Sequence, residues 1–150
     1  MNPLTVTRHV AAAPDRVWAV LTDLEHAPEV IRAVESVEVH TGAGFDVGTR
    51  WSETRTMMGR TASETMEVTT VDPGRSYVVE ADSGSTHFRS EFHLAPDAGG
   101  TIVTMTFDGQ PSGLGGKVLA ATLGRLLAGP TRKALAADLD DIAAASERRG

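Results

Sequence analysis

Glu53, Arg55 and Glu64 interrupt an apolar pattern in residues 51–66, and their side chains are the ones best suited to chemistry. Residues 51–57 read WSETRTM, an alternation that sends every second side chain to the same face of a β-strand. A carboxylate on that face can remove an acidic proton, and a neighbouring guanidinium can stabilise the resulting enolate. If the chain reverses at Gly59-Arg60, one face carries Trp51, Glu53, Arg55, Met57, Glu64 and Met66.

The register of this hairpin decides which charges meet. The same two-residue turn places Arg55 opposite Glu64 and Glu53 opposite Met66. Arg55 and Glu64 then form either a compensated pair inside the sheet or a solvated pair at its rim. Glu53 is expected to line a cavity. Because a close arginine lowers the pKa of a carboxyl group and desolvation raises it, Glu53 is the better candidate base.

Two later hairpins are predicted to extend the apolar face. A tight turn at Ser83-Gly84 and a longer loop at residues 95–100 let bulky side chains face one another. The predicted pairs are Val79 with Phe88, Tyr77 with Ser90, Phe92 with Val103, Ser90 with Met105, and Phe88 with Phe107. Methionines on this face either shape an adaptable pocket or fill the core. The further candidate ligand contacts are Tyr77, Phe88, Ser90, Met105 and Phe107.

Hydrophobic periodicity predicts the elements that position these side chains. Leu4–Val10 alternates as a strand, with Arg8 on its apolar face. Pro14 suits the first turn of a helix, and a second short helix is predicted at about residues 25–32. From residue 34 to residue 108 the period is two and turn signals recur, which indicates six strands in a meander.

A long helix is predicted after the last strand. Its apolar stripe is formed by Leu119, Leu123, Leu126, Leu127, Leu135, Leu139 and Ile142. Pro130 falls inside this stripe and cannot donate a hydrogen bond to Leu126, so the helix should bend or break there. The order strand, two short helices, six strands, long helix predicts an α+β fold with a seven-stranded antiparallel sheet, and it disfavours a parallel nucleotide-binding sheet.

Composition excludes several classes of function. Twenty acidic against fourteen basic side chains give a net charge of −6, so nucleic acid is not an expected partner. The chain has no cysteine, and its five histidines show no metal-ligand spacing. No window approaches the run of about 18 apolar residues that a membrane span needs. We expect one cytoplasmic domain over residues 1–150, with no metal or cofactor.

Several segments, in this order, resemble the START-related, birch-pollen-allergen-like helix-grip superfamily (SRPBCC), especially its bacterial polyketide cyclase/dehydratase and lipid-transport branch. They are APDRVWAVLTD, VGTRWSETRTMMGR, EVTTVDPGRSYVVEA, GGTIVTMTF and the leucine-rich terminal helix. The resemblance implies a curved sheet that grips the long C-terminal helix and encloses an apolar cavity. It supplies no catalytic motif common to the superfamily.

Three functions remain open at this point. The first is binding of a small hydrophobic ligand, of polyketide, lipid or isoprenoid type, in a cavity between sheet and helix. The second is a polyketide cyclase or dehydratase in which Glu53 or Glu64 is the general base and Arg55 stabilises an enolate. The third, a chaperone activator or other interaction module, predicts an exposed apolar patch instead of an enclosed cavity. The sequence does not predict the oligomeric state.

Overall fold

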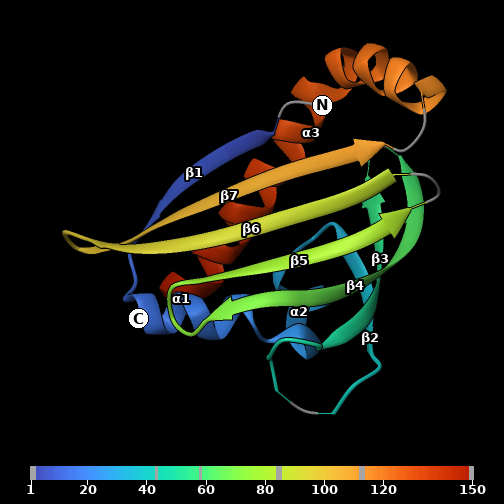
Figure 1. The fold of residues 1–150 in the computed structure, drawn as a ribbon. Helices are drawn as coiled ribbons and strands as arrows, with labels where there is room; N and C mark the ends of the chain where they lie inside the picture. The colour runs from blue at the N-terminus through green and yellow to red at the C-terminus, as the bar shows by residue number, and fades with distance from the viewer. Residues whose placement is uncertain (1–2, 43, 58, 84–85, 112–113, 149–150) are drawn as a thin grey trace.

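Seven antiparallel strands of the described residues form one curved sheet in the order β1-β7-β6-β5-β4-β3-β2 (Figure 1). The computed structural model describes residues 3–42, 44–57, 59–83, 86–111 and 114–148, without the side chains at 57, 111 and 114–127. The strands are β1 (Leu4–Val10), β2 (Val34–Val39), β3 (Arg50–Met57), β4 (Arg60–Asp72), β5 (Ser76–Ser83), β6 (Thr86–Asp97) and β7 (Gly100–Pro111). The consecutive pairing from β2 to β7 confirms the predicted meander, and β1 pairs with β7 at the opposite edge.

Short helices follow β1, as predicted. Helix α1 (Pro14–Leu21) has Pro14 in its first turn and buries Val17 and Val20. The helix expected at about residues 25–32 is divided into a 3-10 turn, η1 (Leu24–His26), and a single turn of α-helix, α2 (Ala27–Val30). These segments lie beneath the sheet in Figure 1, beside the concave face.

The long helix α3 (Leu114–Arg148) runs across the concave face of the sheet. It continues through Pro130, but its axis turns sharply between the orange and the red part of the ribbon in Figure 1, so the helix bends and does not break. Leu135, Leu139 and Ile142 of the predicted stripe are buried. The side chains of Leu119, Leu123, Leu126 and Leu127 lie outside the described residues.

The main core lies where α3 packs against β1, β7 and α1. Val10, Val17 and Val103 are at most 1% exposed there, and Leu139 of α3 is 2% exposed. Such close packing leaves no room for a ligand around these four side chains. A second, smaller cluster contains Trp51, Val68, Tyr77 and Val79 at the β3–β5 end of the sheet.

All three predicted hairpin registers are wrong by two residues. In the first hairpin Met57 pairs with Arg60, so Glu53 faces Glu64 and Arg55 faces Ala62. In the others Val79 faces Ser90, Tyr77 faces Phe92, Ala81 faces Phe88, Phe92 faces Met105, and Ser90 faces Phe107. The first error has a local cause, because Gly59 has φ +77° and takes the second turn position, where arginine would be strained.

The predicted division of the sheet into two faces is nevertheless correct. A shift of two residues returns each side chain to its own face, because side chains alternate with a period of two. On the outer face of β3 and β4 the hydroxyl groups pair across the strands, at 3.1 Å for Ser52 with Thr65 and 2.6 Å for Thr54 with Ser63. The larger apolar side chains of these strands therefore lie on the inner face.

Candidate functional site

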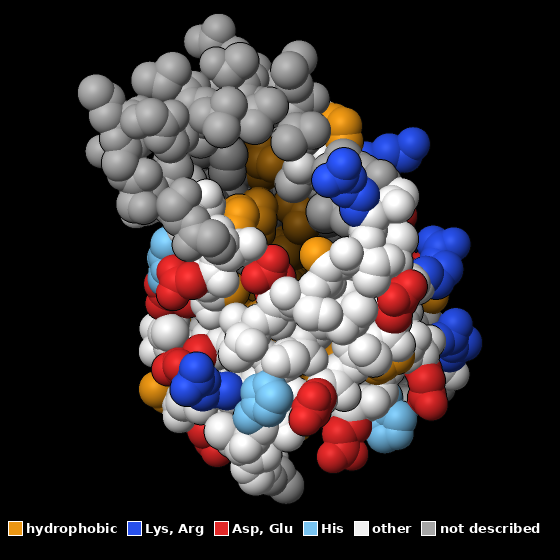
Figure 2. Space-filling view, turned by 90° about the vertical axis from the view of Figure 1, so that its right-hand side faces the viewer, with side chains coloured by type: hydrophobic (Ala, Val, Ile, Leu, Met, Phe, Trp, Pro, Cys, Tyr) orange, Lys and Arg blue, Asp and Glu red, His pale blue; other side chains and the backbone are white. Residues whose placement is uncertain are grey.

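A cavity of about 280 Å³ lies between the concave face of the sheet and the helices. Figure 2 shows a hollow with hydrophobic side chains at its bottom. The described residues of its wall come from β3 to β7, α1, η1, α2, the second part of α3 and the segment before β3. They are Val20, Leu21, Asp23, Leu24, Ala27, Val30, Ile31, Phe45, Trp51, Glu53, Arg55, Glu64, Met66, Tyr77, Val79, Ala81, Phe88, Ser90, Phe92, Met105, Phe107, Thr131, Leu135, Asp138 and Ile142.

Aromatic side chains form much of this wall. Tyr77 stacks on Phe92 with ring centroids 4.8 Å apart, and it meets the edge of Phe45 at 4.9 Å. A second stack joins Phe88 and Phe107 at 5.5 Å. These contacts hold the rings in place, so the wall is preformed as an apolar surface.

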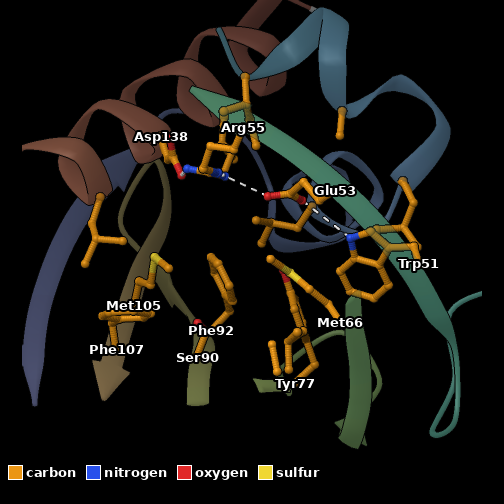
Figure 3. A pocket seen from close by; sticks show the side chains of 18 of the residues that line it. Trp51, Glu53, Arg55, Met66, Tyr77, Ser90, Phe92, Met105, Phe107 and Asp138 are labelled. Atoms are coloured by element: carbon orange, nitrogen blue, oxygen red, sulfur yellow. Dashed lines mark hydrogen bonds and ion pairs between the residues drawn. The ribbon is translucent and has the colours of Figure 1, made fainter. Parts of the chain in front are cut away.

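A buried ion-pair cluster lies at the helix side of the cavity (Figure 3). The Nε of Arg55 donates to Oε2 of Glu53 at 3.1 Å, and its Nη1 donates to Oδ2 of Asp138 at 2.6 Å. Trp51 donates its indole N–H to the other oxygen of Glu53, at 3.4 Å. The side chains of Glu53 and Asp138 are 11% and 9% exposed, and that of Arg55 is 23% exposed. One guanidinium therefore serves two carboxylates that are largely removed from water.

Burial and ion pairing act in opposite directions on the pKa values of Arg55 and Asp138. Desolvation raises the pKa of Asp138, and the attraction of Arg55 offsets this only in part. Burial by itself would lower the pKa of Arg55, but Asp138 and Glu53 outweigh it, so its pKa is raised and it stays charged. Burial, with Glu53 nearby, raises the pKa of Tyr77, which remains a neutral phenol. Burial therefore makes Asp138 easier to protonate than an exposed aspartate.

The predicted Arg55–Glu64 pair is wrong. The shift in register moves Glu64 opposite Glu53, and Glu64 accepts a hydrogen bond from the hydroxyl of Ser83 at 2.9 Å. Arg55 instead reaches across the cavity to α3. Two carboxylates directly opposite each other repel. The ion pair of Arg55 with Glu53 therefore reduces the repulsion between Glu53 and Glu64.

The structure brings most of the predicted site residues to this one cavity. Its wall includes Trp51, Glu53, Arg55, Glu64, Met66, Tyr77, Phe88, Ser90, Met105 and Phe107. The side chain of Met57 lies outside the described residues.

Sequence reasoning missed Asp138, Phe45 and Phe92 as cavity residues. For Asp138 a signal existed, since it stands three residues after Leu135 and four before Ile142, on the apolar stripe of the helix. An acid on such a stripe needs a partner, and here that partner is Arg55.

The described residues contain no group of three histidine or acidic side chains arranged to hold a metal ion. None of the described helices is long and apolar enough to cross a membrane.

A curved antiparallel sheet around a long C-terminal helix, with an apolar cavity between them, defines a helix-grip protein of the SRPBCC superfamily. The chain belongs to the family described as "Polyketide cyclase / dehydrase and lipid transport", whose model matches residues 1–147. No curated protein matches the chain.

Solved structures share this fold at low sequence identity. The TTHA0849 protein of Thermus thermophilus is 19% identical with a TM-score of 0.81, over 99% of both chains. The Zhui aromatase/cyclase of Streptomyces sp. R1128 is 18% identical with a TM-score of 0.76, over 99% of this chain and 94% of that one. The di-domain aromatase/cyclase StfQ of the steffimycin biosynthetic pathway is 18% identical with a TM-score of 0.74, over 98% of this chain and 51% of that one.

Proposed function

We propose that this protein binds a small, mainly apolar molecule in the cavity between the sheet and α3. The observation that carries the proposal is an apolar, aromatic-walled space of about 280 Å³ with a charged cluster at one side. That volume lies near the lower end of the range for ligand pockets. Water forms few hydrogen bonds with such apolar walls. An apolar ligand that replaces this water is therefore stabilised by the burial of its own apolar surface.

The wall suggests how the ligand lies. Its flat or aliphatic part packs against Tyr77, Phe92 and Phe107, and its polar end meets Glu53 and Arg55 (Figure 3). The family description and the aromatase/cyclase neighbours support ligands of polyketide or lipid type. A few oriented polar groups in an apolar wall are typical of sites that select one orientation of a ligand.

A fluorescence titration tests this proposal. The neutral dye N-phenyl-naphthylamine should bind saturably at one site per chain and change the emission of Trp51, which lines the cavity. Ser90→Trp should abolish binding because it fills the cavity. Arg89→Trp is the matched control, since Arg89 is exposed on the outer face of the same strand. Equal binding by both variants would show that the dye binds elsewhere.

A second candidate, a polyketide cyclase or dehydratase, rests on a carboxyl group with raised pKa beside a guanidinium. The carboxylate of Glu53 already accepts hydrogen bonds from both Trp51 and Arg55. We propose Asp138 in its place. It would take a proton from the carbon between two ketones, Arg55 would stabilise the enolate, and the new alkoxide would recover the proton after the enolate carbon attacks another carbonyl.

Product analysis with a poly-β-ketone substrate tests the second candidate. Asp138→Asn should slow cyclisation by about a hundredfold or more, whereas Glu53→Gln should have a smaller effect. Both should retain dye binding. Absence of any conversion by the unaltered protein, together with saturable binding, would leave the binding function alone.

The described surface gives less support to an interaction module. Val47, 64% exposed, is the one large hydrophobic side chain among the described residues that is strongly exposed. A single side chain of this kind does not form a docking patch.

A further inference from the structure

The cavity wall contains more acidic than basic side chains. Arg55 is the only lysine or arginine among the described residues that line the cavity, and three carboxylates, Glu53, Glu64 and Asp138, share that wall with it. A fourth, Asp23, lies against the exposed imidazole of His26 at 2.8 Å. From this imbalance we infer that the ligand carries a neutral or cationic polar end and is not a carboxylic or phosphoric acid. The inference rests on the proposed binding function.

Arg55 is not free to receive a ligand that arrives as an anion, because two carboxylates of the protein already bind it. Its Nε is bonded to Glu53 and its Nη1 to Asp138, and both carboxylates are nearly buried. A ligand carboxylate would therefore enter as a third anion around one guanidinium. In a poorly hydrated cavity that repulsion is weakly screened, and the ligand would also lose its own hydration.

Glu64 adds to this repulsion. It accepts a hydrogen bond from Ser83, a neutral hydroxyl, and the ion pairs formed by the described residues do not include it. Its position directly opposite Glu53 on the neighbouring strand brings a further negative charge to the same part of the wall. The local field therefore favours a positive or neutral group.

The wall offers suitable partners to such a group. Each carboxylate oxygen can accept more than one hydrogen bond, so Glu53 can receive the proton of a ligand hydroxyl or ammonium group in addition to its present donors. Arg55 has five N–H groups, of which two are used by the described carboxylates, so it can also donate to a hydroxyl or ketone oxygen. Phenols, alcohols, ketones and amines fit this pattern, and free fatty acids do not.

Three probes with one ring system test the inference at neutral pH. We expect naphthylmethanol and naphthylmethylamine to bind at least about tenfold more tightly than naphthoic acid in calorimetric titrations. Glu64→Gln should strengthen binding of naphthoic acid several-fold and change the affinity for naphthylmethanol much less. The control is Glu67→Gln on the same strand, because Glu67 lies on the outer face and pairs with Arg50 at 3.5 Å.

The outcomes separate the inference from the proposed function. Naphthoic acid that binds as tightly as the alcohol to the unaltered protein would overturn the inference and leave the cavity as a binding site. An equal gain in acid affinity from Glu64→Gln and Glu67→Gln would also overturn it, because the effect would then come from net charge. Failure of all three probes, and of the neutral dye, would overturn the proposed binding function itself.

Discussion

The two ends of the inner sheet face are packed in opposite ways. At the β1–β7 end, α3 packs directly on the strands, and Val17 and Val103 have no exposed surface. At the β3–β5 end the wall stands away from the helix, Met66 is only half-buried, and a cavity remains. The same face therefore serves stability at one end and leaves room for the proposed ligand at the other, because distance from the helix decides whether side chains can fill the space.

Two arginine–aspartate ion pairs, one at each end of the sheet, differ in the same way in their exposure to water. Arg8 of β1 and Arg55 of β3 both extend from the inner face to an aspartate on α3. The Arg8–Asp140 pair is 3.3 Å long with side chains 43% and 58% exposed, whereas the Arg55–Asp138 pair is 2.6 Å long and largely buried. Water screens the first pair and is mostly excluded from the second, so their contributions to stability should differ.

The largest expected effect comes from Arg55→Met. This change leaves Glu53 and Asp138 buried without a cation and should lower the free energy of unfolding by about 3–5 kcal/mol in urea titrations. Without Arg55, burial and the charge of Glu53 keep the pKa of Asp138 in the folded state above its pKa in the unfolded chain. The folded state then binds protons more tightly, so the deficit should shrink as the pH falls from neutrality toward about 5.

A double variant checks the origin of this effect. Arg55→Met combined with Asp138→Leu should recover much of the lost stability, because it removes a buried charge as well as its partner. A deficit that does not change with pH and does not recover in the double variant would contradict the electrostatic explanation.

Truncation of apolar side chains probes the packing difference directly. Leu139→Ala, at the filled end, should cost about 2–5 kcal/mol because it creates a new cavity in close-packed surroundings. Met66→Ala, at the hollow end, should cost about 1 kcal/mol, because the side chain already borders open space. The difference between their urea midpoints is the measurement. Equal losses would mean that the β3–β5 end is packed as tightly as the other.

Binding of a ligand in the cavity should stabilise the folded protein. Naphthylmethanol at about one hundred times its dissociation constant should raise the free energy of unfolding by about 2.7 kcal/mol, since it binds the folded state alone. Ser90→Trp, which occupies the cavity, should show no such gain in a thermal melt with and without the probe. A gain of the same size in this variant would place the binding site outside the cavity.

The smallest effect is expected from Arg8→Met. Its pair with Asp140 is exposed on both sides, so its loss should cost about 1 kcal/mol or less and should not depend on the cavity ligand. Urea unfolding alongside Arg55→Met gives the comparison. A cost near that of Arg55→Met would show that exposure does not account for the difference between the two arginines.

Much of the fold was predictable from residue patterns. Alternation in WSETRTM placed Trp51, Glu53 and Arg55 on one face, and the structure agrees. Hairpin register was not predictable by the same argument, because a shift of two residues leaves both faces unchanged in character. Left-handed turn positions were local signals that distinguish the registers, at Gly59 (φ +77°) in the first hairpin and at Gly99 (φ +78°) in the third.

The sequence alone determined the order of the elements and which side chains of each element lie on its apolar face. Periods of two and 3.6 residues are local properties of the chain. Only the tertiary structure decided which charges meet and where the cavity lies. Arg55 and Asp138 are 83 residues apart in the chain, and their contact depends on how far α3 stands from the curved sheet. That separation results from packing at the opposite end, between α3, β1 and β7, which no local pattern near Arg55 records.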